Sequence, residues 1–249
     1  MILAIRAYPN IRLGAPQGIE NKNKSVRWQS TIMSAQSLAA LQRLTGYQLE
    51  GSHDLMNNLS ATADDILACA RSLIIAGGYN GFSYADIADV VGIRKPSIHH
   101  HFPTKADLVR TLVSRYREEA AAGLAHLERQ TSDPLEQLRS YTGYWAACIR
   151  DASAPFCVCA LLASELPVLP AEVALEVRAH FRALSAWLTS VLERGQREGR
   201  LALTDAPRIE AEAFIATVHG AMLSARAYGD PEIFGAVTAR LIDRLCSQQ

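Results

Sequence analysis

The sequence predicts an all-α protein, with an N-terminal three-helix helix-turn-helix domain followed by a larger helical domain. Two observations predict this fold class. Apolar residues recur at helical spacing from residue 61 to the end of the chain, without the alternation typical of strands. Proline, glycine and aspartate interrupt this periodicity at short intervals, which divides it into nine expected helices. With 249 residues, 49% of them hydrophobic, the chain is long enough to bury a substantial core.

The first expected helix runs from Thr62 to Ala76, and the segment after it has the spacing of two short helices joined by a tight turn. A small residue at Ala88 allows these two helices to cross closely. Gly92 accepts the turn conformation that a Cβ disfavours, and Ile98 anchors the second helix to the core. The spacing therefore predicts a helix-turn-helix.

Residues at the expected helix ends support these boundaries. The Ser83 hydroxyl is expected to cap the first short helix, and Asp86 places negative charge in its first turn. Pro96 is tolerated in the first turn of the second short helix, where backbone amides have no intrahelical acceptor to lose. Thr104 is expected to cap the helix that follows.

This segment resembles the tetracycline-repressor (TetR) family of transcriptional regulators. The likeness runs from Ala61 to Val109, with Phe82 in the turn, Ile87-Ala88 in the second helix and the run Ser97–Lys105 across the third helix into the fourth. The resemblance implies a homodimeric DNA-binding regulator, more often a repressor than an activator. It also implies that a small-molecule effector, bound in the second domain, releases the protein from an inverted-repeat operator.

The exposed side of the second short helix carries most of the residues expected to contact double-stranded DNA. Ile98 and Phe102 point inward at i and i+4, so the residues between them face outward. Arginine and lysine can bond guanine edges or phosphates, and hydroxyl and imidazole groups can contact bases or phosphates. The candidate DNA contacts are Ser83, Tyr84, Arg94, Lys95, Ser97, His99, His100 and Lys105. Because the net charge is zero, few phosphate contacts and a modest salt dependence are expected.

Two domains are expected, with residues 61–106 forming the helix-turn-helix domain and residues 107–249 the effector-binding and dimerisation domain. The later helices are expected at residues 104–130, 134–151, 155–166, 170–198, 206–228 and 231–247. The resemblance implies an apolar effector pocket among them, for which polar groups such as His180, Glu165 or His219 are available. Its candidate lining residues are Tyr141, Trp145, Phe156, Cys157, Phe181 and Trp187, although ordinary core packing is the simpler role for each one taken singly.

Dimerisation follows from the resemblance, with the last two helices pairing with their symmetry mates as a four-helix bundle. The small residues that allow close approach are Ala211, Ala216, Gly220, Ala221, Ser224 and Ala225, and the apolar residues that supply buried area are Ile215, Val218, Met222 and Leu223.

The five cysteines are scattered through expected helices, which argues against a secreted disulfide framework. Cys157 and Cys159 are expected to splay to different faces of one helix, so that buried packing is the simplest role for them. The alternative is a thiol sensor for electrophiles or oxidants. The run His99-His100-His101 cannot converge on one metal ion, because consecutive helical residues project about 100° apart. Neither a metal nor a cofactor is expected.

Residues 1–60 contain scattered glycines, prolines and asparagines and no clear amphipathic stripe. We expect either a disordered arm or an extension upstream of a true start at Met56. No apolar run is long enough to span a membrane, and the short apolar N-terminus is not a signal peptide, so a cytoplasmic location is expected.

Common catalytic and nucleotide-binding motifs are missing from the sequence, including G-x-S-x-G, H-E-x-x-H, G-x-x-x-x-G-K and G-x-G-x-x-G. An enzyme is therefore not expected. The rival interpretation is a helical protein-binding adaptor that does not bind DNA, which the neutral charge balance favours.

Overall fold

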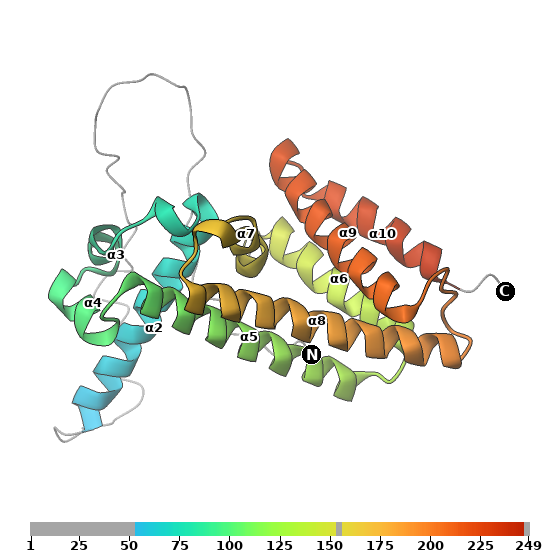
Figure 1. Cartoon of the computed structure of the whole chain (residues 1–249), viewed down its shortest axis with the longest axis horizontal. Helices are drawn as coiled ribbons and strands as arrows, with labels where there is room; N and C mark the ends of the chain where they lie inside the picture. Colours follow the sequence, from blue (N-terminus) through green and yellow to red (C-terminus); the bar gives the residue numbers. More distant parts are fainter. Residues whose placement is uncertain (1–52, 153–155, 247–249) are drawn as a thin grey trace, which may run out of the picture. The chain divides into compact units, whose positions relative to one another are not determined.

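The computed structural model describes residues 53–152 and 156–246, and side chains from residue 62. Within these residues the chain forms nine α-helices and two short 3-10 helices, which confirms the all-α class and the expected helix count (Figure 1). The expectations for residues 1–52 lie outside the described residues. Helix α2 spans His53–Gly77, so residues 53–60 are helical, contrary to the expectation of a disordered arm.

The predicted helix-turn-helix is formed by α3 (Tyr84–Val91) and α4 (Lys95–His101), which follow the 3-10 helix η1 (Tyr79–Gly81). The turn between them has Gly92 in the left-handed conformation at φ 77°, and its N–H donates to the Ala88 carbonyl at 2.9 Å. Ile87 and Ile98 are fully buried. Local sequence signals therefore give this motif its boundaries and its inward face.

A long helix, α5 (Lys105–Gln130), leads from the helix-turn-helix into the second domain. It begins at a capping box, in which Thr104 accepts from the Asp107 N–H and the Asp107 carboxylate accepts from the Thr104 N–H. α5 packs against α8 (Ala171–Arg197), beside which it runs in Figure 1. The element that continues from the motif is thus part of the second domain's core.

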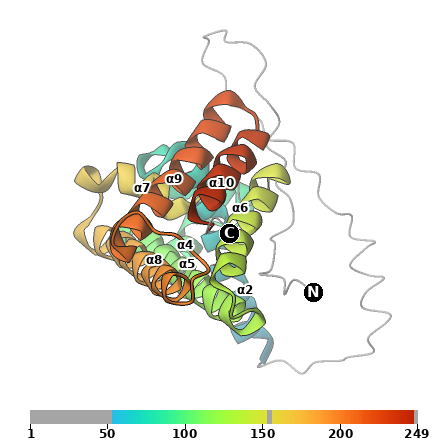
Figure 2. The same cartoon turned by 90° about the vertical axis from the view of Figure 1, so that its right-hand side faces the viewer.

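The remaining helices surround this pair. They are α6 (Pro134–Arg150), α7 (Val158–Ser164), the 3-10 helix η2 (Leu166–Val168), α9 (Pro207–Tyr228) and α10 (Glu232–Leu245). α9 packs against α8 and α10, and α10 also packs against α6 (Figure 2). The expected boundaries of the helices after residue 104 are correct to within one or two residues except at 155–166, where α7 begins only at Val158, and α2 begins nine residues before the expected Thr62.

The core of the second domain includes an apolar stripe along α8. Its buried members are Val173, Val177, Leu184, Leu188 and Val191, whereas Phe181 is half-buried. On α9 the prediction was partly wrong, because six of the residues expected at a dimer interface are buried within the chain itself. These six are Ala211, Ile215, Val218, Ala221, Met222 and Ala225. They pack inward because α9 lies against both α8 and α10.

Candidate nucleic-acid interface

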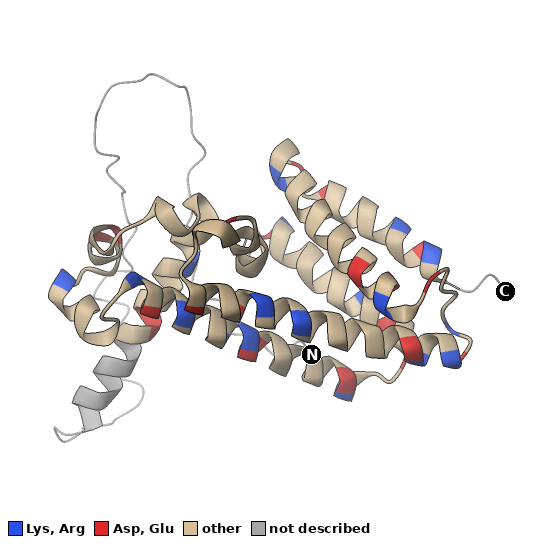
Figure 3. Ribbon diagram, viewed as in Figure 1, with Lys and Arg blue, Asp and Glu red and all other residues tan. Residues whose placement is uncertain are grey.

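Helix α4 presents one face to the protein and the other to solvent. Ile98 is fully buried and Phe102 is 6% exposed, so two apolar anchors fix the rotation of the helix. Arg94, Lys95, His99 and His100 are exposed, and Ser97 is half-buried. Figure 3 shows basic residues where α4 begins. The structure therefore places five of the eight predicted DNA contacts on α4 or at its N-cap, and four of these five side chains are exposed.

Ser83 and Tyr84, at the start of α3, have internal partners. Ser83 forms a capping box with Asp86, whose carboxylate accepts from the Ser83 N–H at 2.7 Å. The Tyr84 hydroxyl donates to the Phe102 carbonyl at 2.8 Å, and its ring lies 4.7 Å from the His99 ring. Burial raises the pKa of Tyr84 to about 12, which keeps this donor protonated. Tyr84 thus braces α3 against the C-terminal end of α4.

Lys105, at the start of α5, points into the protein. Its ammonium donates to the Phe82 carbonyl and lies 4.0 Å from the centre of the Phe82 ring and 4.9 Å from that of Tyr79. Burial lowers the pKa of this ammonium. The geometry gives Lys105 a structural role between η1 and α5, in addition to the phosphate contact expected from the sequence.

Glu165, directly after α7, links the second domain to the helix-turn-helix domain. Both its carboxylate oxygens accept from the Tyr79 N–H, at 2.9 and 3.2 Å. Gly78 makes room for this contact, because a Cβ there would lie 2.2 Å from Glu165 Oε1. In this structure the Glu165 carboxylate is used by the domain contact, and its role in an effector pocket stays a prediction.

A second contact joins the same two domains. The guanidinium of Arg226, near the end of α9, donates to the Ile75 carbonyl in α2 at 2.9 Å. It also lies 5.7 Å from the centre of the Phe156 ring. Together with Glu165, this contact means that movements of α7 or α9 bear directly on the base of the helix-turn-helix domain.

The six candidate effector-pocket residues lie within the packed interior of the second domain. Trp145, Phe156 and Cys157 are buried, while Tyr141, Phe181 and Trp187 are half-buried and pack against the core. The Tyr141 ring lies 5.8 Å from that of Trp187, and the Phe181 ring lies 5.4 Å from that of His219. Tyr141, Trp187 and Phe181 thus have aromatic neighbours, and the role of all six residues in binding an effector stays a prediction.

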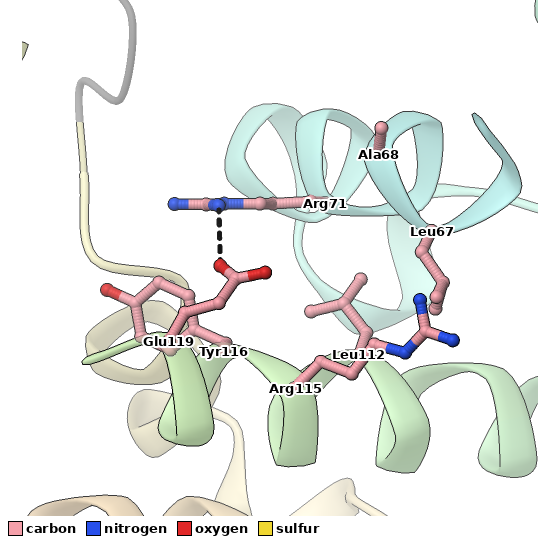
Figure 4. A pocket seen from close by; sticks show the side chains of 7 residues that line it. All are labelled: Leu67, Ala68, Arg71, Leu112, Arg115, Tyr116 and Glu119. Atoms are coloured by element: carbon pink, nitrogen blue, oxygen red, sulfur yellow. Dashed lines mark ion pairs between the residues drawn. The ribbon is translucent and has the colours of Figure 1, made fainter. Parts of the chain in front are cut away.

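A small pocket of about 40 Å³ lies elsewhere, between α2 and α5 (Figure 4). This volume holds about three water molecules. Arg71 of α2 and Glu119 of α5 form an ion pair across it at 4.0 Å. The other lining residues are Leu67, Ala68, Leu112, Arg115 and Tyr116. The pocket adjoins the two helices that support the helix-turn-helix.

The two cysteines of the C-x-C pair depart from the geometry that the sequence predicts. Cys157 precedes α7 as its N-cap residue in an extended conformation, so the two residues do not share one helix. Both side chains lie in the interior, and Cys159 interacts with Cys157 strongly enough to lower the pKa of the Cys157 thiol. Both are buried, at 1% and 0% exposed. The prediction was wrong because it extended the helix three residues too far toward the N-terminus.

Comparison with known proteins agrees with this architecture. Residues 66–112 match the family model for bacterial regulatory proteins of the tetR family, and residues 134–241 match that for a tetracyclin repressor-like C-terminal domain. A TetR-family transcriptional regulator from Agrobacterium tumefaciens is 67% identical, with a TM-score of 0.75. The alignment covers 76% of this chain and the whole of that one. The chain belongs to the tetR family of bacterial regulatory proteins.

More distant members of the family align less completely. A TetR transcriptional regulator from Legionella pneumophila is 28% identical with a TM-score of 0.66, over 73% of this chain and 95% of that one. The HTH-type transcriptional activator FasR of Mycolicibacterium smegmatis is 28% identical over 30% of this chain. The alignments with the curated relatives span only 34% to 39% of those proteins.

Sequence reasoning on this TetR-family chain missed the domain contacts of Glu165 and Arg226. The nearest sequence signal for the first is the glycine pair Gly77-Gly78 before Tyr79. In the part of the chain that the structure describes, no group of three histidine, cysteine or acidic side chains is placed to hold a metal ion. No helix among the described residues is both long and apolar enough to cross a membrane.

Proposed function

We propose that this chain is a transcriptional regulator that inserts α4 into the major groove of DNA. The observation that carries the proposal is the two-sided character of α4, in which Ile98 is fully buried while Arg94 and Lys95 are exposed. A recognition helix needs this combination, because its base-reading side chains must project from a rigid support. Tyr84 adds to that support by bonding the Phe102 carbonyl.

The proposed DNA-binding form is a homodimer assembled through α9 and α10. An unbroken row of exposed small and apolar side chains follows one face of α9 at intervals of three or four residues. This row is Ile209, Ala213, Ala216, Gly220, Leu223 and Ala227. Ile209 and Leu223 are 55% and 59% exposed, and on α10 Val237 is 37% exposed. Two copies packed along this row would bury it and would space two recognition helices for an inverted repeat.

Regulation is proposed to follow from the contacts between the domains. A ligand that moves α7 or α9 would strain the bonds from Glu165 to Tyr79 and from Arg226 to Ile75, and so change the position of α4. The resemblance to repressors favours release from the operator as the response. Because a bacterial regulator acts on chromosomal DNA, we also propose a cytoplasmic location. The proposed function does not involve catalysis.

The test measures binding of the purified protein to DNA from upstream of its own coding region, with a scrambled fragment as control, at two salt concentrations. Arg94→Ala and Lys95→Ala should each weaken binding by about 1–3 kcal/mol if the side chain reads a base. If it contacts a phosphate, the salt dependence should decrease by about one unit per lost contact instead. Arg182→Ala is the matched control, because Arg182 is an exposed arginine on α8.

Equal binding to both fragments that is unchanged in the α4 variants would refute the proposed DNA interface. Absence of any DNA binding would favour a protein-binding role for the same exposed face.

A further inference from the structure

Two thiols and three other polar side chains meet in the interior of the second domain. The hydroxyl of Tyr116, on α5, donates to Cys157 Sγ at 3.3 Å, and its ring lies 5.3 Å from the ring of His180 on α8. The side chains of Cys159, His180 and His219 also interact with Cys157 and favour its thiolate form. Polar side chains from α5, α7, α8 and α9 therefore surround one buried sulfur atom, which accepts a hydrogen bond from Tyr116.

The two thiols of this cluster differ in acidity. The hydrogen bond from Cys159, with those from His180 and His219, lowers the pKa of Cys157 well below its usual range, although burial opposes this shift. Burial raises the pKa of Cys159. The order follows from the geometry, since a sulfur that accepts several hydrogen bonds is stabilised as a thiolate. Cys157 is therefore the nucleophile of the pair, and Cys159 is a protonated thiol beside it.

A small pocket adjoins the cluster at Tyr116. Tyr116, which bonds Cys157, also lines the pocket of about 40 Å³ between α2 and α5 (Figure 4). A space for about three waters admits hydrogen peroxide or a similarly small oxidant and excludes a bulky electrophile. Because both cysteines are at most 1% exposed, large thiol reagents are also kept out.

We propose that hydrogen peroxide converts Cys157 and Cys159 into a reversible disulfide, and that this disulfide weakens DNA binding. The second part depends on the function proposed above. In the first step the Cys157 thiolate attacks one peroxide oxygen, the O–O bond breaks, and the departing hydroxide takes up a proton to become water. In the second step Cys159 sulfur attacks the sulfenic acid of Cys157, the S–O bond breaks and the Cys159 proton leaves with the hydroxyl as water. Two thiols are oxidised, and one peroxide is reduced to two waters.

Two connections carry this chemistry to the helix-turn-helix domain. A disulfide takes away the thiolate that accepts the Tyr116 hydroxyl, leaving a buried donor on α5 without its charged acceptor. The two thiols lie at the N-terminal end of α7, and Glu165 follows its C-terminal end directly. The Glu165 carboxylate accepts a hydrogen bond from the Tyr79 N–H. Drawing Cys157 toward Cys159 therefore strains both α5 and the contact to Tyr79.

The first experiment uses the reduced full-length protein and hydrogen peroxide, and needs no DNA. Intact mass should decrease by two hydrogen atoms, and peptide mapping should place the disulfide between Cys157 and Cys159. Cys159→Ser should instead gain one oxygen on Cys157, which a sulfenic-acid reagent traps once the oxidised protein is unfolded, and Cys157→Ser should not react at this site. Cys148→Ser is the matched control, because Cys148 is a buried thiol outside the cluster and its loss should change nothing.

The second experiment measures affinity for DNA enriched by the reduced protein from a random-sequence library. Oxidation should lower affinity by about tenfold to a hundredfold, and a thiol reductant should restore it. If the wild-type protein shows no disulfide after peroxide treatment, the thiol chemistry is wrong. If the disulfide forms and affinity is unchanged, the coupling is wrong. If the reduced protein binds no DNA, the proposed function and the regulatory half of this inference fail together, while the mass change still decides the chemistry.

Discussion

Replacing Gly78 with alanine should destabilise the protein through the contact between the two domains. Gly78 has φ 77° and ψ −175°, a backbone region that is almost closed to residues with a side chain. The new Cβ would also lie 2.2 Å from Glu165 Oε1 and 2.9 Å from its Cδ. The flexible carboxylate can move aside, but only by giving up the Tyr79 N–H that it holds at 2.9 Å.

The expected magnitude has two parts. Backbone strain at this position costs about 2–3 kcal/mol, and the loss of a hydrogen bond to a charged group costs about 1.5–3 kcal/mol. The free energy of unfolding should therefore fall by about 3.5–6 kcal/mol. Gly92→Ala is the comparison, because Gly92 also has φ 77° but lies in the ordinary left-handed region with open space around its Cβ position. It should cost about 1–2 kcal/mol.

Urea unfolding of four proteins separates the two parts. These are the wild type, Gly78→Ala, Glu165→Ala and the double variant. Because Glu165→Ala removes both the clash and the hydrogen bond, Gly78→Ala should cost about 1.5–3 kcal/mol less in that background than in the wild type. Equal costs of Gly78→Ala in the two backgrounds would refute the reasoning, since they would mean that the Glu165 contact contributes nothing to stability.

Three further outcomes are expected. Tyr84→Phe should lower the free energy of unfolding by about 1 kcal/mol, because the hydrogen bond to the Phe102 carbonyl is lost. Equal urea unfolding curves for the wild type and the variant would contradict this prediction. Leu223→Arg should convert the proposed dimer into a monomer in sedimentation experiments, whereas Leu175→Arg, on α8 and equally exposed at 59%, should leave it intact. Burial by itself raises the pKa of Glu210, but hydrogen bonds from the preceding loop outweigh it and lower the pKa below its ordinary value. The free energy of unfolding of the wild type should therefore exceed that of Glu210→Gln by its full amount above about pH 5, and this difference should decline as the pH falls toward about 3. Urea unfolding at a series of pH values measures the difference, and a constant value would contradict the prediction.

Local signals in the sequence predicted the helix-turn-helix because its determinants lie within a few residues of one another. Ser83 and Thr104 each bond an amide within three positions, and Gly92 sets the turn by its own conformation. The contact between Glu165 and Tyr79 joins residues that are 86 positions apart. No local pattern encodes such a pairing, so it had to come from the structure.

The errors on α9 and α7 have different physical causes. α9 carries small and apolar residues on more than one face, so periodicity alone does not say which face its own chain covers. Ala211 and Met222 point to the core, while Ala216 and Leu223 face solvent. At Cys157 the helix begins without a side-chain cap. With no capping residue to mark the start, the boundary was placed too early and the two thiols were assigned to one helix.

The inward orientation of Lys105 affects how the protein would be shared among sites on a chromosome. With this ammonium held by the Phe82 carbonyl and two aromatic rings, each subunit has fewer cations with which to bind arbitrary sequences. Random genomic DNA would then retain a smaller part of the cellular pool. Occupancy of an operator would require fewer copies of the protein, because competition from the vast excess of other sites is weaker.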